Sequence, residues 1–223
     1  MKPHVNKHYC LASIKSTRTF AKVFANDTVI IFQNDKTKIG LGILMVGHMF
    51  KILQSINEPV SVADYDFSVG SKMKLIPSVY LIIDPANSND SFRLGQLLIF
   101  IRPKYFVGTS SLTRMSDLQS IISNQQFAGA LMKEDKIKPI FVLLVDRGPD
   151  ENQKHMKNII QYCNFFSAYN PVERSMASLS EKFASITLPI DNFESYLDSQ
   201  EKVLDKDLAL RNFEFAGNHL YDI

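Results

Sequence analysis

The clearest hydrophobic pattern in the chain is the apolar run Ile140–Val145, which ends abruptly at Asp146. A short apolar run that turn residues bound predicts a buried β-strand. Gly148 and Pro149 follow, and apolar residues then recur at helical spacing, at Met156, Ile159, Ile160 and Cys163. We therefore expect Asp146 at the carboxyl end of a buried strand and just before a helix, where open α/β sheets place their ligands.

Three more strands are expected earlier in the chain. The β-branched run Thr28–Phe32 predicts the first of them. Two further apolar runs, Pro77–Ile83 and Leu97–Ile101, are separated by turn formers and predict a hairpin with a long turn. Ser110 or Ser111 can then cap a helix whose apolar side would carry Leu112, Met115, Leu118 and Ile122.

Two helices are expected in the last third of the chain. The segment Asn170–Glu173 has the composition of a helix start, and its apolar stripe would be Val172, Met176, Leu179 and Phe183. A terminal helix is predicted by Leu208, Phe213, Ala216 and Leu220. The whole order is strand, strand, strand, helix, strand, helix, helix. A ribonuclease-H-like domain has this order with a fifth strand before its last helix.

The predicted fold class is therefore α/β, a ribonuclease-H-like mixed sheet flanked by helices that lacks its fifth strand. Phe165–Tyr169 is too short to supply a strand and its connections. The predicted organisation is an N-terminal extension at 1–26, a core at 27–185 that is shortened between 163 and 169, and a C-terminal helical extension at 186–223.

Composition limits the function classes. The chain has 223 residues with 45% hydrophobic and 22% charged content, which is ordinary for a globular protein, and its net charge is only +2. A nucleic-acid surface would therefore have to be a local patch. Cys10 and Cys163 have no paired spacing, and neither a secretory signal nor a bilayer-spanning run is present. His4, His8 and Cys10 lack a second ligand pair, so a surface loop is the better interpretation.

Seven segments resemble transposon-derived proteins with a DDE integrase-like catalytic core: NDKTKIGLGI, KLIPSVYLIID, GQLLIFIRP, GTSSLTRMSDL, LLVDRGPDEN, SAYNPVERSMASLS and ITLPID. The pair VDRGPDEN and YNPVER is the most specific. The second resembles the NPIE-type motif that holds the last acid in Tc1/mariner-like transposases. The resemblance implies a ribonuclease-H-like fold, metal-dependent phosphodiester chemistry on DNA and a nuclear rather than cytoplasmic location, and it leaves self-association open.

The resemblance also implies a metal site. Two hard cations, Mg²⁺ or Mn²⁺, take oxygen ligands and together activate the attacking oxygen and stabilise the leaving one. By resemblance, Asp35 after the first strand, Asp146 after the fourth and Glu173 on the following helix are the catalytic, metal-binding acids. Lys36, Lys72, Lys74 and Arg147 are expected to contact DNA phosphates on the same face.

Each acid has a simpler structural interpretation. Glu173 stands three residues after Asn170, as in a capping box, and spacing alone favours that role over a ligand. Asp146 and Asp35 are both also consistent with turn acids. Related sequences carry two adjacent acids at the first position, where this chain has Asn34 and Asp35. If Asn34 stands at the ligand position, it supplies no negative charge and metal binding would be weak.

The chain departs from the family pattern in two further ways. Arg147 stands where the pattern is glycine-rich, and only 27 positions separate Asp146 from Glu173, which indicates an internal deletion. The chain also starts and ends inside the resemblance, as a fragment or decayed copy would. Two functions are therefore expected: a DDE-type transposase or endonuclease core, or a catalytically inactive module that binds DNA or a protein. Gly70-Ser71-Lys72 is not a phosphate loop, because Tyr65 replaces its first glycine.

Overall fold

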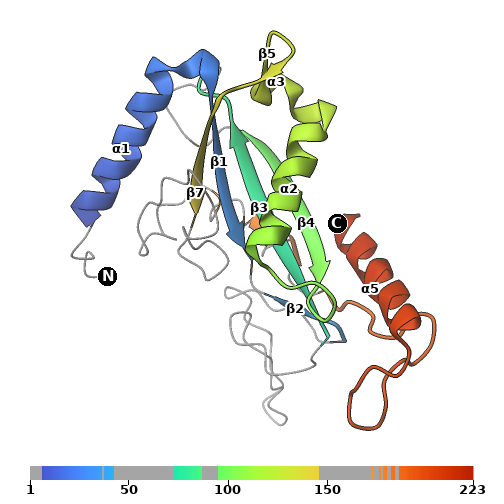
Figure 1. Ribbon diagram of the computed structural model, residues 1–223. Coiled ribbons are helices and arrows are strands. Elements are labelled where there is room, and N and C mark those ends of the chain that lie inside the picture. Colours follow the sequence, from blue (N-terminus) through green and yellow to red (C-terminus); the bar gives the residue numbers. More distant parts are fainter. Residues whose placement is uncertain are drawn as a thin grey trace. The chain divides into compact units, whose positions relative to one another are not determined.

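A computed structural model describes residues 7–36, 38–42, 73–86, 95–145 and 186–222, and also Val172, Met176, Ser178, Leu179, Lys182 and Phe183. Figure 1 shows its elements along the chain. They are α1 (Lys7–Val23), η1 (Ala25–Asp27), β1 (Thr28–Asp35), β2 (Ile39–Gly40), β3 (Lys74–Ile83), β4 (Gln96–Pro103), α2 (Ser111–Ser123), η2 (Gln125–Phe127), α3 (Ala128–Leu131), β5 (Met132–Lys133), β6 (Lys136–Ile137), β7 (Ile140–Val145) and α5 (Lys206–Tyr221).

The main sheet is mixed. It has five strands in the order β2-β3-β1-β7, with β4 also paired to β3. Strand β7 runs parallel to β1, from Thr28 opposite Ile140 to Gln33 opposite Val145, and β2 runs antiparallel to β3. All four predicted strands are present, and the mixed sheet with flanking helices is confirmed. The expected shortening between 163 and 169 lies outside the described residues.

The chain divides into two compact units. Unit 1 comprises 1–34, 79–99 and 109–175, and unit 2 comprises 35–78, 100–108 and 176–223. Strands β1, β3 and β4 each run from one unit into the other. Residues of one strand therefore belong to different units.

In unit 1, α2 lies across β3 and β4, as Figure 1 shows. Its start agrees with the sequence prediction, because Ser110 caps the helix and forms a capping box with Thr113. Its predicted apolar side is confirmed only in part: Leu118 is buried and Ile122 is half-buried, but Leu112 is 81% exposed and Met115 54% exposed. Arg114 and Asp117 are buried as well. Arg114 and Asp117 turn inward because the sheet presents a polar group, the hydroxyl of Tyr80, to this helix.

That hydroxyl is the centre of a buried set of three side chains, called here the Tyr80 network. Tyr80 donates to Asp117 Oδ2 at 2.5 Å, and Arg114 Nη1 donates to the Tyr80 oxygen at 3.1 Å. Burial raises the pKa of Tyr80 well above its usual range, and the hydrogen bond to Asp117 raises it further. Because each buried polar group has a partner, the network fixes α2 on the sheet without an unpaired charge.

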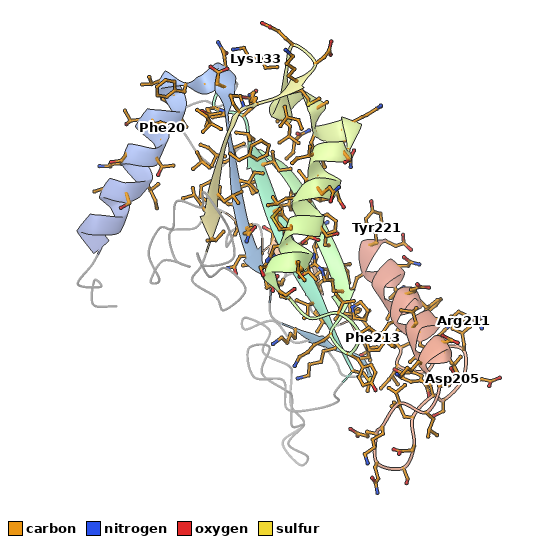
Figure 2. The ribbon with its side chains drawn as sticks, in the orientation of Figure 1. Phe20, Lys133, Asp205, Arg211, Phe213 and Tyr221 are labelled. Carbon is orange, nitrogen blue, oxygen red and sulfur yellow. The ribbon has the colours of Figure 1, made fainter. Side chains whose placement is uncertain are left out.

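The core of unit 2 is built around α5. Asp205 caps this helix by accepting from the backbone N–H groups of Asp207 and Leu208. Its buried side carries Ala209, Phe213, Ala216 and Leu220, which pack with Ile39, Leu41, Met73, Leu75, Phe183, Leu188 and Tyr196. Figure 2 labels Phe213, whose ring meets Phe106 edge-on at 5.9 Å. The predicted terminal helix is therefore confirmed, with Leu208 only partly buried.

The helical stripe predicted around Glu173 is confirmed at the positions that the structure describes. Val172, Met176 and Phe183 are buried and Leu179 is partly buried, whereas Ser178 and Lys182 are exposed. Described helices include none that is both long and apolar enough to cross a membrane. The helix predicted from Met156 to Cys163 lies outside the described residues.

Candidate metal and nucleic-acid site

Asp35 ends β1 and is half-buried. Its Oδ1 accepts a hydrogen bond of 2.5 Å from the hydroxyl of Ser78, on the neighbouring strand β3. The backbone supports this alignment, because the N–H of the next residue, Lys36, donates to the carbonyl of Pro77 at 2.8 Å. Antiparallel pairing at Lys36 and Pro77 places Asp35 opposite Ser78, with both side chains on one face of the sheet.

Arg102 extends this arrangement to a third strand. Its Nη1 donates to the Ser78 oxygen, and the side chain is buried although it carries a charge. The guanidinium also lies over the Phe100 ring, 5.6 Å from its centroid. These three residues, Arg102, Ser78 and Asp35, form a row across β4, β3 and β1 that is called here the Asp35 row. The row restricts rotation of the carboxylate and places a positive charge near it.

The two candidates for the first acid, Asn34 and Asp35, lie on opposite faces of β1, because side chains alternate along a strand. Asp35 shares its face with Ser78. Lys36, on the other face, is buried and donates from Nζ to the carbonyl of Met176 at 2.8 Å. This burial disfavours a role for Lys36 in contacting DNA, since an ammonium that reaches phosphate has to be accessible.

The strands that precede two of the expected acids end together. The parallel register pairs Gln33 of β1 with Val145 of β7. In the sequence, Asp146 follows Val145 directly and Asp35 follows Gln33 by two residues. Both strand ends are buried up to this point, since Gln33 and Val145 are almost fully covered.

Four of the predicted site residues lie outside the described residues: Asp146, Arg147, Glu173 and Lys72. The convergence of the three acids therefore stays a prediction. Within the described ranges, no three His, Cys, Asp or Glu side chains come close enough to hold a metal ion. Asp35, the one predicted acid that the structure describes, fits a hard cation, because it offers carboxylate oxygen held in place by a neighbouring hydroxyl.

Two members of the Asp35 row, Ser78 and Arg102, were not among the predicted site residues. Ser78 lies inside a predicted strand and Arg102 directly follows another, but nothing in the sequence shows which positions on adjacent strands face one another. An arginine inside a strand that is otherwise apolar was the available signal, because a buried arginine needs an acceptor.

Comparison with known proteins finds matches among solved structures only. No protein-family model matches the chain, and no curated protein matches it. The chain is similar to crystal structures of the mariner Mos1 transposase.

The protein chain in the paired-end complex with Mg has 13% sequence identity to this chain. The alignment covers all of this chain and 61% of that chain, with a TM-score of 0.39. The paired-end complex with Mn is 13% identical, covering 98% and 62%, with a TM-score of 0.42. The strand transfer complex is 13% identical, covering 94% and 57%, with a TM-score of 0.41. This chain thus spans about three-fifths of those chains. At this level the similarity assigns no residue roles.

Proposed function

We propose that this chain is a DDE-type nuclease or strand-transfer core that acts on DNA phosphodiesters, with Mg²⁺ or Mn²⁺ held by Asp35, Asp146 and Glu173. The observation that carries the proposal is the parallel β1–β7 pair, which ends with Gln33 opposite Val145. Asp35 and Asp146 follow these two residues in the sequence. A two-metal site needs carboxylates from separate elements at one edge of a sheet, and the shared edge at which these two strands end supports that part of the requirement.

The chain's own residues prepare the first acid. Ser78 donates to Asp35, and Arg102 in turn donates to Ser78. A ligand held in one orientation loses less conformational entropy when a cation binds, and partners of this kind typically change metal affinity about 10–100-fold. The bound cations would supply the activation of the attacking oxygen and the stabilisation of the leaving oxygen.

The second candidate function is a catalytically inactive DNA-binding module. It is favoured by one specific observation, that Asn34 and Asp35 lie on opposite faces of β1. If the other acids converge on the face of Asn34, the site has an amide in place of a carboxylate. Such a protein would retain affinity for DNA and lose cleavage.

The test is incubation of the purified chain with a labelled DNA duplex and Mn²⁺. We expect nicking that falls by at least about 100-fold in Asp146→Asn, because the variant removes a charged metal ligand. Asp191→Asn is the matched control, since Asp191 is exposed and lies outside the proposed site. Salt-sensitive binding without nicking would favour the inactive module, and absence of both would contradict both functions.

A further inference from the structure

Three lysines from neighbouring segments come together in unit 2. Lys38 stands just before β2, Lys74 is the first residue of β3, and Lys104 directly follows β4. The backbone N–H of Lys104 donates to the carbonyl of Lys74 at 2.8 Å, and Gly40 of β2 pairs with Lys74 on its other side. These residues are called here the lysine cluster. The sequence predicted a DNA contact only at Lys74 among them.

The three ammonium groups influence one another. The pKa of Lys74 is lowered by partial burial first, and then by the positive charges of Lys104 and Lys38. Lys38 and Lys104 are exposed, and Lys74 is half-buried. Like charges held this close together repel one another in the free protein, so an anion that binds among them relieves an existing repulsion.

The lysine cluster lies on the same strands as the Asp35 row. Lys74 precedes Ser78 by four residues on β3, and Lys104 follows Arg102 by two residues. Because side chains alternate along a strand, even spacings leave these pairs on one face. At ~3.4 Å per residue, Lys74 is about 14 Å from Ser78 along β3. That distance exceeds the screening length of ~10 Å at 0.1 M salt, so the lysines have little direct effect on Asp35.

A ligand that is long enough to span this distance can contact both the lysine cluster and the Asp35 row. We propose that Lys38, Lys74 and Lys104 bind the phosphate backbone of a DNA duplex about four nucleotides from the phosphodiester at Asp35. The separation of about four nucleotides follows from the rise of ~3.4 Å per nucleotide along one DNA strand. This inference rests on the proposed function and adds to it the surface that positions the substrate. Lysine suits the role, because its ammonium group binds phosphate as a mobile point charge and needs no fixed geometry.

The overall charge of the chain makes a local patch necessary. A net charge of +2 on 223 residues does not attract a polyanion, so binding has to come from cations gathered on one surface. Each phosphate that a protein neutralises contributes about −0.9 to the slope of log affinity against log salt concentration. Three lysines in the lysine cluster would account for a slope of about −2.7.

The experiment compares the full chain with a Lys38→Gln, Lys74→Gln, Lys104→Gln variant. Binding to a fluorescent 20-base-pair duplex is measured by anisotropy, without metal, across a range of salt concentrations. We expect the variant to bind at least about tenfold more weakly at 0.1 M salt, with a salt slope reduced by about 2–3. Thermal unfolding of the variant is followed in parallel, and no loss of stability is expected, because the substitutions remove a repulsion.

The matched control is Lys136→Gln, Lys202→Gln, Lys206→Gln, which removes the same charge from exposed lysines elsewhere in the chain. We expect it to keep the wild-type slope within one unit. If both triple variants weaken binding equally, binding depends on net charge alone and the inference is overturned. If neither weakens it, the lysine cluster is not the binding surface. If the wild-type chain binds no DNA, the proposed function fails as well.

A second measurement separates the inference from catalysis. A duplex with one neutral methylphosphonate linkage about four nucleotides from the nicked position should bind the wild-type chain more weakly, and the lysine variant should not discriminate against it. Equal discrimination by both proteins would overturn the placement of the cluster. Absence of nicking alongside normal salt-dependent binding would remove the catalytic proposal and leave the binding surface.

Discussion

The Tyr80 network in unit 1 and the Asp35 row in unit 2 have the same chemical order. In each, an arginine donates to a hydroxyl and the hydroxyl donates to an aspartate. Their surroundings differ, since Asp117 lies on the buried side of α2 whereas Asp35 is half-buried at a strand end. The same arrangement can therefore stabilise a core or hold an acid ready for a ligand, according to where the acid lies.

The largest expected effect comes from breaking the Tyr80 network. Arg114→Met should lower the free energy of unfolding by about 3–5 kcal/mol, because it removes the buried guanidinium that donates to Tyr80 and leaves the negative charge of Asp117 in the network unbalanced. Urea unfolding followed by circular dichroism measures this change. Adding Asp117→Asn should restore part of the loss, since no buried charge then remains. A loss below 1 kcal/mol for Arg114→Met would show that the network does not stabilise α2.

The matching change in the Asp35 row should cost less stability. Arg102→Met should lower the free energy of unfolding by about 1–3 kcal/mol, because water can solvate Asp35 once its support is lost. The same variant should weaken Mn²⁺ binding about 10-fold, which a purely structural arginine would not do. A stability loss as large as that of Arg114→Met, with unchanged Mn²⁺ affinity, would mean that the two arrangements serve the same structural purpose.

The buried hydroxyl of Tyr196 provides a control for the predictions on the Tyr80 network and the Asp35 row. Tyr196 is buried in the core of unit 2, and among the described residues its hydroxyl has no hydrogen-bond partner. An unsatisfied buried hydroxyl costs about 1–3 kcal/mol, so Tyr196→Phe should raise stability by about 1 kcal/mol. Thermal and urea unfolding would detect this gain. A loss of stability would indicate that the hydroxyl is satisfied in solution.

A further effect on stability appears only at alkaline pH. Burial raises the pKa of Tyr196 to about 12, above its ordinary value of 10.0, and the nearby Asp191 adds to the rise. The folded chain therefore keeps this proton while the unfolded chain releases it. The resulting stability is complete below pH 10 and is lost as the pH rises towards about 12. Unfolding measured across this range should show a shallower decline in Tyr196→Phe than in the wild-type chain.

Much of the fold could be predicted from the sequence. The strands at 28–32, 77–83, 97–101 and 140–145 were predicted because buried strands are short apolar runs between turn formers. The start of α2 followed from Ser110, and the stripe from Val172 to Phe183 followed from helical spacing. These features are local, so the residues that carry them are neighbours in the chain.

The buried side of α2 and the Asp35 row could not be predicted in the same way. Leu112 and Met115 have the apolar spacing of a buried face, but Tyr80 selects Arg114 and Asp117 instead. Similarly, Ser78 faces Asp35 only because of the register between β1 and β3. Tertiary pairing decides both cases, and a single sequence does not encode pairing in any local pattern.

Titration of the purified chain with Mn²⁺ tests the central claim most directly, with binding followed by calorimetry in the wild-type chain, Asp35→Asn and Asn34→Ala. If Asp35 is a metal ligand held by Ser78 and Arg102, the wild-type chain and Asn34→Ala should bind Mn²⁺ alike, and Asp35→Asn should bind at least about 100-fold more weakly. Equal Mn²⁺ affinity in the wild-type chain and Asp35→Asn would contradict the account.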